Sequence, residues 1–324
     1  MKLHGKCNTM AKCIYYNTPA TIRDVAHFFI KKIMRVNIIK NFEQYDAFIK
    51  KYELREFGDL DESMFLRSYM LDFNSFIKLF GSHPHGCDPF SDEYVKWEMA
   101  FFEFLSGKRY SFDSEGFDAP ANTKSIPTDF WNMNYRIHQM RIYADLLDKI
   151  RPKAGEHVLE MGFGWGYLLE LFGRCGCHVT GVDVSKNFVE YAANLLSAQN
   201  IKANLFCGAF YDIDSFDEKF DLIIFDNSFH HCGEPLRLLE ILNKKTSAGC
   251  RIFFVNEPIM MYADRPWGII RYDGETILQI RKRGWLELGY RIDFFKELLC
   301  RAGFQLKNTY SMCDGNMLYE AAPG

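Results

Sequence analysis

After residue 127, short apolar runs alternate with longer segments whose apolar residues recur at intervals of three and four positions. The runs predict strands, and the longer segments predict amphipathic helices. The predicted strands are 158–161, 179–182, 204–207, 222–225, 250–255, 304–309 and 317–321. The predicted helices are 137–150, 168–172, 187–197, 235–242 and 294–302. This order predicts an α/β fold with a doubly wound, seven-stranded, mostly parallel sheet.

Before residue 120 the pattern is helical throughout. The helical stripes run over 18–33, 42–52, 65–80 and 91–107, with Pro19 as a helix start and Gly81 and Gly107 as stops. We predict an N-terminal helical module and linker over residues 1–125, with a polar linker or lid at 108–126. Residues 126–324 then form the α/β domain, with an insertion at 257–292. The basic, amphipathic stretch 28–40 is more often a core helix with solvated lysines, and peripheral membrane contact is the alternative.

The segment from His157 to Asp183 carries the clearest chemical signal. An apolar run breaks into glycines at 162, 164 and 166, a helix follows, and a second apolar run ends on Asp183. Glycines leave no Cβ between the turn and whatever lies over it. A carboxylate about 20 residues further on is placed to bind a ribose diol. We predict a site for a nucleoside-containing cofactor.

Glu160, two residues before the first glycine, favours one class of nucleoside. The spacing is G-x-G-x-G rather than G-x-G-x-x-G, and an acid there would repel a pyrophosphate. Over roughly residues 127–324 the sequence resembles the class I S-adenosylmethionine-dependent methyltransferases, whose first motif is E/D-x-G-x-G-x-G. The alternatives are a dinucleotide-binding oxidoreductase and a glycine turn without a ligand.

The resemblance implies a fold in which the last strand is inserted antiparallel, and a set of cofactor contacts. Ala209 stands where many relatives have an Asp that accepts from the adenine, so Phe210 or Asp212 would have to take that role. The implied cofactor is S-adenosyl-L-methionine, and the product is S-adenosyl-L-homocysteine. The implied cofactor contacts are Glu160, Gly162, Phe163, Gly164, Asp183, Val184, Gly208, Ala209, Phe210 and Asp226.

Methyl transfer needs a base only where the acceptor is protonated at neutral pH, as an alcohol is. His230, His231 and Glu257 lie at predicted strand ends and are the candidate bases, although a histidine at that place is also common without a catalytic role. The stretches 83–87 and 230–232 contain His and Cys, but neither has a second half with metal-ligand spacing. We predict no metal.

The insertion combines tryptophans with arginines and acids, which suits a polar, ring-shaped substrate. It has a weaker resemblance to bacterial methyltransferases associated with glycan and surface-polysaccharide synthesis. We predict that it closes over the acceptor and excludes water, and the alternative is a lid whose tryptophans are simply buried. The predicted substrate contacts are Tyr135, Arg265, Trp267, Arg271 and Asp273.

Net charge, apolar runs and cysteine spacing reduce the number of possible functions. A net charge of −3 and a pI near 6.3 give no bulk attraction to nucleic acid. We find no apolar run long enough to span a membrane, no signal peptide and no CxxC pair among ten cysteines, which predicts a reduced, cytoplasmic protein. The predicted function is O-methylation of a sugar or other polar small molecule. A protein or nucleic-acid methyltransferase and a non-catalytic cofactor-fold protein are the alternatives, and a homodimer through the N-terminal helices is left open.

Overall fold

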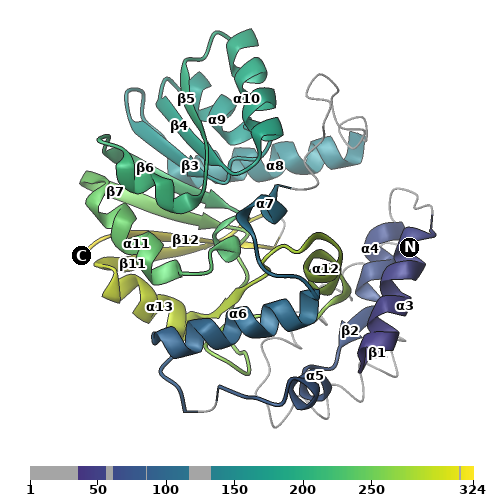
Figure 1. Ribbon diagram of the computed structural model, residues 1–324. Helices are drawn as coiled ribbons and strands as arrows, with labels where there is room; N and C mark the ends of the chain where they lie inside the picture. The colour runs from purple at the N-terminus through teal and green to yellow at the C-terminus, as the bar shows by residue number, and fades with distance from the viewer. Residues whose placement is uncertain (1–35, 56–60, 85, 117–132, 314) are drawn as a thin grey trace. The chain divides into compact units, whose positions relative to one another are not determined.

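The computed structural model describes residues 36–55, 61–84, 86–116, 133–313 and 315–324 (Figure 1). Contacts divide the chain into two compact units. Unit 1 contains residues up to Tyr110 together with Pro258–Phe295, and unit 2 contains Ser111–Glu257 and Lys296–Gly324. Sequence analysis assigned most of Pro258–Phe295 to the α/β domain as an insertion, whereas its contacts group it with the N-terminal residues.

Unit 2 is built on a seven-stranded sheet in the order β11-β12-β7-β6-β3-β4-β5. All neighbouring pairs are parallel except those of β12, which runs antiparallel to both β7 and β11. The predicted doubly wound, mostly parallel sheet with its last strand antiparallel is therefore confirmed. The strands are β3 (His157–Met161), β4 (His178–Asp183), β5 (Ala203–Cys207), β6 (Phe220–Asp226), β7 (Thr246–Val255), β11 (Phe304–Ser311) and β12 (Met317–Pro323).

Helices cover both faces of this sheet, so its central strands are apolar on both sides (Figure 1). On β6, Leu222 and Ile224 pack into the core formed with α8, α9 and α10, and the intervening Ile223 and Phe225 are also fully buried. A local signal marks the start of α10. The Ser185 hydroxyl caps this helix by accepting a hydrogen bond from the Phe188 N–H. The helices are α7 (Phe112–Glu115), α8 (Met133–Ile150), α9 (Tyr167–Arg174), α10 (Lys186–Ala198), α11 (Pro235–Lys244) and α13 (Ile292–Arg301), whose first residues belong to unit 1.

Unit 1 combines helices from the N-terminal part with short strands from Pro258–Phe295. Helix α6 begins after the Ser91 cap and ends at Gly107 in the left-handed conformation, as the pattern predicts. The strands form a parallel pair, β1-β2, and a three-stranded sheet, β8-β10-β9. The helices are α3 (Phe42–Glu53), α4 (Asp61–Arg67), α5 (Phe73–Phe80), α6 (Asp92–Ser106) and α12 (Gly274–Leu278), and the strands are β1 (Asn37–Ile39), β2 (Tyr69–Leu71), β8 (Ile259–Met260), β9 (Trp267–Gly268) and β10 (Gly289–Arg291).

Two helix predictions in unit 1 are wrong. The stripe 65–80 is interrupted by β2, and the end of the stretch 28–40 is strand β1. Both strands depend on distant partners, since β1 pairs with β2 and the Leu71 N–H donates to the Tyr272 carbonyl at 2.8 Å. Helical spacing within one segment carries no information about such pairing. The predicted helix 18–33 and most of the linker 108–126 lie outside the described residues.

Among the residues that the structure describes, no helix is both long enough and apolar enough to cross a membrane.

Candidate cofactor and active site

The turn after β3 takes a backbone conformation that only glycine adopts easily. Gly162, Gly164 and Gly166 have φ of 71°, 51° and 74°. A Cβ on Gly162 would lie 2.7 Å from the Cβ of Ser228, but a Cβ on Gly164 would meet no protein atom within 4 Å. Gly164 therefore borders open space at the carboxyl end of the sheet, where ligands of such folds bind. Phe163, between them, turns its ring into the core.

Glu160 lies at the end of β3, immediately before this turn. It is 3% exposed, and its Oε2 atom has no hydrogen-bond partner among the described residues. Burial, together with the nearby carboxylates of Asp226 and Asp183, raises the pKa of Glu160 well above its ordinary value. A buried carboxyl oxygen without a partner is costly unless a ligand supplies one. The donor that would suit this position is a cation, such as the ammonium group of the methionine part of the predicted cofactor.

Asp183, at the end of β4, holds the turn in place. Its Oδ2 accepts from the Gly164 N–H and its Oδ1 from the Ser185 N–H, each at 2.8 Å. Burial raises the pKa of Asp183 to about 6, although both N–H groups act in the opposite direction. The predicted ribose contact therefore also fixes the shape of the glycine turn. Val184, which follows it, is half-buried.

The turn after β5 lacks the acid that many relatives have, and the structure shows what Asp212 does instead. Its Oδ2 accepts from the Ala209 N–H at 2.8 Å and would clash with a Cβ on Gly208. Asp212 is thereby engaged in shaping the turn. Phe210 meets Phe225 edge-to-face with ring centroids 6.0 Å apart, and its ring lies beside Gly162.

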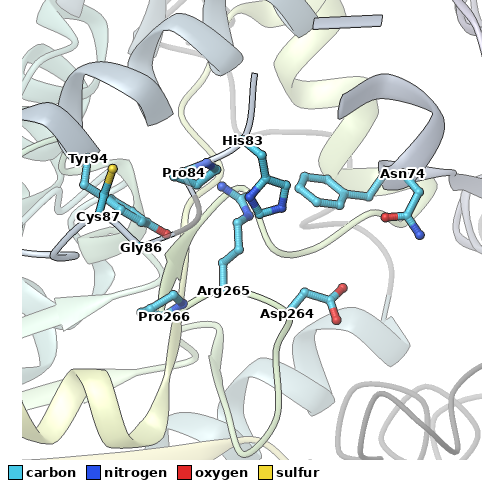
Figure 2. Close-up of a pocket in the computed structure, with 10 residues that line it drawn as sticks. Asn74, His83, Pro84, Gly86, Cys87, Tyr94, Asp264, Arg265 and Pro266 are labelled. Atoms are coloured by element: carbon cyan, nitrogen blue, oxygen red, sulfur yellow. The ribbon is translucent and has the colours of Figure 1, made fainter. Parts of the chain in front are cut away.

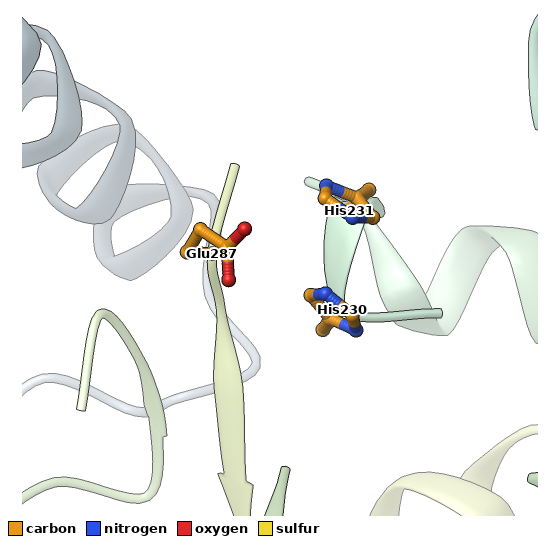
Figure 3. A group of neighbouring side chains, drawn as sticks. All are labelled: His230, His231 and Glu287. Carbon is orange, nitrogen blue, oxygen red and sulfur yellow. The ribbon is translucent and has the colours of Figure 1, made fainter. Parts of the chain in front are cut away.

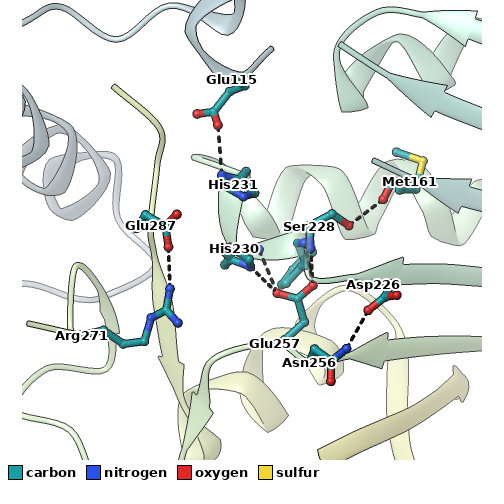
Figure 4. A network of polar contacts seen from close by, with 11 residues as sticks. Glu115, Met161, Asp226, Ser228, His230, His231, Asn256, Glu257, Arg271 and Glu287 are labelled. Carbon is teal, nitrogen blue, oxygen red and sulfur yellow. Dashed lines mark hydrogen bonds and ion pairs between the residues drawn. The ribbon is translucent and has the colours of Figure 1, made fainter. Parts of the chain in front are cut away.

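Glu257 organises the turn that follows β6 (Figure 4). Its Oε1 accepts from the N–H groups of Ser228 and Phe229, each at 2.8 Å. Its Oε2 accepts from the His230 N–H at 3.1 Å and lies 2.8 Å from His230 Nδ1. Burial raises the pKa of Glu257 to about 7, against these hydrogen bonds. With both oxygens engaged in these contacts, Glu257 holds the turn and the His230 ring in place.

Ser228 ties this turn to the first strand. Its hydroxyl donates to the Met161 carbonyl at 2.6 Å, which links the β6 loop to the glycine turn. Asp226 accepts from the Asn256 side chain at 2.9 Å, so it joins the β6 and β7 loops. Sequence analysis assigned Ser228 no role, because a serine in a loop carries no periodic signal.

His230 and His231 are adjacent, and their ring centroids lie 4.2 Å apart (Figure 3). The His230 side chain is only 3% exposed, and that of His231 is 20% exposed. His231 Nδ1 lies 3.0 Å from Oε2 of Glu115, an ion pair by distance rather than an aligned hydrogen bond (Figure 4). Glu115 was not among the predicted site residues, because it lies in a polar stretch without a strand or helix pattern.

Three of the predicted substrate contacts have structural partners within unit 1. Arg265 is 2% exposed, pairs with Glu98 and lies over the Phe73 ring at 4.8 Å. Trp267 is buried and donates its indole N–H to the Pro89 carbonyl. Asp273 caps α12 by accepting from the Thr276 N–H. Their burial and these hydrogen bonds indicate a framework role for Trp267 and Asp273.

The other predicted contacts differ in exposure. Arg271 pairs with Glu287, and its side chain keeps 25% of its surface exposed (Figure 4). Tyr135 lies in α8, and its side chain is outside the described ones. Arg281, Lys282 and Arg283 form a short basic cluster. Arg281 pairs with Asp46 at 2.8 Å and Lys282 with Glu53 at 3.8 Å, so two of these three cations lie beside carboxylates.

Unit 1 contains a cavity of about 450 Å³, with the buried Arg265 in its wall (Figure 2). The guanidinium pairs with Glu98 and donates to the Ile269 carbonyl, but its Nε has no partner among the described residues. The cavity combines the Phe73 ring with polar groups. Its lining is Phe73, Asn74, His83, Pro84, Gly86, Cys87, Tyr94, Asp264, Arg265 and Pro266.

Comparison with protein families gives a match over residues 158–245, which span β3 to α11. The matching family is described as "Methyltransferase domain". Residues 158–245 are a methyltransferase domain. The match confirms the predicted methyltransferase domain over these residues.

Curated relatives are similar over part of the chain. The ubiquinone biosynthesis O-methyltransferase of Coxiella burnetii is 26% identical over 142 residues, 41% of this chain and 59% of that protein. Its counterpart in Aromatoleum aromaticum is 26% identical over 159 residues, 46% of this chain and 62% of that protein. The chain thus spans about three fifths of the length of each of these curated relatives.

Solved structures of methyltransferases are also similar to the chain. The magnesium protoporphyrin IX methyltransferase of Synechocystis, crystallised with S-adenosylmethionine, covers 66% of this chain with 93% of its own. Its sequence is 16% identical and the TM-score is 0.46.

Proposed function

We propose that this protein transfers a methyl group from S-adenosylmethionine to a hydroxyl of a polar small molecule. The observation that carries the proposal is the buried Glu160 oxygen without a partner, next to a glycine turn that borders open space. A carboxylate there complements an ammonium and opposes a pyrophosphate, which favours this cofactor over a dinucleotide.

Four residues of unit 2 are each proposed to contact a different part of the cofactor. Glu160 takes the ammonium of the methionine part, Gly164 gives close approach to the backbone, and Asp183 takes the ribose hydroxyls. Phe210 contributes a ring face for the adenine. When bound, the cofactor supplies an electrophilic methyl group on a sulfonium, so the protein's remaining task is to align the acceptor and take its proton.

His230 and His231 are the proposed bases. The two curated relatives are named as O-methyltransferases, which agrees with an oxygen acceptor. Neither name refers to a glycan, so we propose the coarser class, a hydroxyl-bearing small molecule. A phenol, with a pKa of about 10, needs less help from a base than a sugar alcohol does. Replacing the base therefore distinguishes the two acceptor classes, because turnover of a sugar alcohol should fall more than turnover of a phenol.

Unit 1 is the proposed site of acceptor selection. Its segment Pro258–Phe295 leaves unit 2 directly after Glu257, at the carboxyl end of β7. Arg271 is partly exposed, and Arg265 presents an unpaired Nε in the wall of a cavity. Both remain proposed substrate contacts. Replacement of Arg265 would test the cavity only together with a stability measurement, since the Glu98 pair depends on it.

Calorimetry with S-adenosylhomocysteine tests cofactor binding. Glu160→Gln removes the charge and should weaken binding by roughly 10–100-fold, since a hydrogen bond to a charged group contributes about 1.5–3 kcal/mol. Gly164→Ala should weaken it as well, because the new methyl enters the open space. The matched control is Gly155→Ala, at a turn with φ of 87° where a Cβ also meets no atom within 4 Å.

Both alanine variants carry a similar backbone cost, about 1 kcal/mol, so the control isolates the effect of the ligand space. Equal affinity in Gly164→Ala and Gly155→Ala would contradict the proposed site. Binding of NAD in place of S-adenosylhomocysteine by the wild type would contradict the enzyme class. Mass spectrometry for a gain of one methylene, across panels of phenols and nucleotide sugars, then identifies the acceptor.

A further inference from the structure

The described residues that line the cavity of unit 1 all belong to that unit (Figure 2). They come from α5, from the stretch that follows α5, from α6 and from segment 264–266. The cavity volume of about 450 Å³ lies within the usual range for small-molecule pockets, roughly 300–1,000 Å³. Contacts from unit 1 can therefore hold a small molecule there.

One part of the lining is apolar. It consists of the rings of Phe73, Pro84, Tyr94 and Pro266, of which the first three residues are buried. The Tyr94 hydroxyl is engaged elsewhere, since it donates to the Trp267 carbonyl at 3.0 Å. A ligand in contact with these rings would gain stability, because the contact removes apolar surface from water.

Arg265 contributes a buried hydrogen-bond donor to the wall of the cavity. Its guanidinium pairs with Glu98, donates to the Ile269 carbonyl and interacts with the Tyr272 side chain. It also lies over the Trp97 ring at 5.1 Å, so its position is held from several sides. The Nε atom nevertheless has no hydrogen-bond partner among the described residues. A buried donor without a partner is costly, and an acceptor oxygen of a ligand would satisfy it.

The charges around the cavity favour an uncharged ligand. Arg265 and Glu98 are 2% and 1% exposed and carry opposite charges, so together they contribute no net charge. Asp264 adds an exposed carboxylate to the lining, and the His83 imidazole also borders the cavity. An anion at Arg265 would lie near the carboxylate of Glu98 as well. A cation would meet the guanidinium and has no lone pair to accept its hydrogen.

We infer that the cavity of unit 1 binds an uncharged small molecule, which packs an apolar body against the four rings and places an acceptor oxygen at Arg265 Nε. The inference names the class of molecule that unit 1 selects, and it rests on the proposed function for the identity of that molecule as the acceptor. Glu98 is then a specificity-determining residue, because its charge compensates that of Arg265 and disfavours anions.

Three probes of nearly equal shape test the inference, because benzamide is neutral, benzoate is an anion and benzamidine is a cation. Ligand-observed NMR with the full chain at pH 8 gives their dissociation constants. Burial raises the pKa of Glu98 to about 7, so its carboxyl group is largely ionised at pH 8. Benzamide should bind with a dissociation constant of roughly 1–10 mM, as expected for a small fragment, and at least about tenfold more tightly than either charged probe.

A variant that fills the cavity tests where benzamide binds. Cys87→Trp places an indole in the lining and should weaken benzamide binding by at least about tenfold, because the space is taken. The matched control is Cys300→Trp, which makes the same exchange at an exposed thiol of unit 2 and should bind benzamide as the wild type does.

A second variant tests the role of Glu98. Glu98→Gln removes the negative charge beside Arg265 and should reduce the preference for benzamide over benzoate to within about threefold. Glu93→Gln removes an exposed carboxylate of the same helix and should keep the preference of the wild type. Thermal denaturation shows whether both variants fold, and the comparison of the three probes on the wild type does not depend on either.

Two results would overturn the inference without the Glu98 variant: benzoate or benzamidine binding as tightly as benzamide, or benzamide binding equally well to Cys87→Trp. An unchanged preference in folded Glu98→Gln would overturn the role of Glu98. Calorimetry with S-adenosylhomocysteine on the wild type keeps these results separate from the proposed function. If S-adenosylhomocysteine binds and benzamide does not, the cavity inference fails alone. If benzamide binds and S-adenosylhomocysteine does not, the proposed function fails.

Discussion

Glu160 in unit 2 and Glu98 in unit 1 are both buried glutamates, but the charged groups around their carboxylates differ. Glu98 is 1% exposed and pairs with Arg265, and the Ile269 N–H donates to it as well. Glu160 is 3% exposed, keeps an oxygen without a partner among the described residues, and has acids as its charged neighbours. Burial raises the pKa of both, that of Glu98 to about 7.

The difference separates framework from binding site. A buried acid that has its counter-charge inside the same unit holds the chain together, and its environment is complete. A buried acid among other acids is stable only if it keeps a proton or meets a cation from outside. By this criterion Glu160, at the glycine turn, is the buried acid that we expect to meet a ligand. Most of the charged residues that drew attention to the insertion 257–292 belong to the framework.

The largest effect should come from breaking the pair in unit 1. Arg265→Met leaves Glu98 buried without its counter-ion, which should lower the free energy of unfolding by about 3–5 kcal/mol. Urea denaturation followed by tryptophan fluorescence measures it. The double variant Glu98→Met, Arg265→Met should recover most of the loss, because it leaves no buried charge. A single variant as stable as wild type would remove the contrast between the two glutamates.

A smaller effect on the free energy of unfolding is expected when the pH is varied, because Asp183 in the cofactor turn titrates. Asp183 has a folded-state pKa of about 6 against an ordinary 3.8. The folded state holds this proton more tightly, so the stability contributed by Asp183 is greatest below pH 3.8, falls as pH rises, and is flat above about pH 6. Integrated over that window the loss is at most about 3 kcal/mol.

Asp183→Asn provides the comparison, since it lacks the titrating group. Denaturation curves of the two proteins between those pH values should diverge as pH rises, with the wild type losing relative stability. If the difference in free energy of unfolding between the two proteins stayed constant with pH, or if the wild type gained relative stability as pH rose, the pKa of Asp183 would not be raised in the folded state. The environment of the turn would then not disfavour its negative charge.

The smallest effect should come from an exposed pair in unit 1. Lys282 lies 3.8 Å from Glu53, with side chains 36% and 50% exposed. Lys282→Ala should change the free energy of unfolding by less than about 0.5 kcal/mol, because solvent screens the pair. The same denaturation assay applies. A loss approaching that of Arg265→Met would show that burial is not what distinguishes the charged pairs of this unit.

The sequence predicted the sheet and the glycine turn because both depend on local patterns. Apolar runs mark buried parallel strands, and glycines at fixed spacing mark a turn with positive φ. It did not predict strand β2, and it gave the burial of Trp267 only as an alternative, since each depends on a partner far along the chain. Glu115 was missed for the same reason.

The difference in surroundings between His230 and His231 also required the structure. Both residues stand at the right place in the sequence, and residue type alone does not distinguish them. Their exposed fractions and their different carboxylate partners do.

The two-segment construction of unit 1 has a consequence for synthesis on the ribosome. The Tyr45 hydroxyl donates to the Ile277 carbonyl and Tyr94 to that of Trp267, so N-terminal aromatics need residues made much later. While the intervening residues of unit 2 are being added, those aromatic side chains lack the surface that buries them. Nascent chains of this kind expose apolar groups and aggregate readily. The early helices should therefore depend on chaperones until translation has passed Phe295.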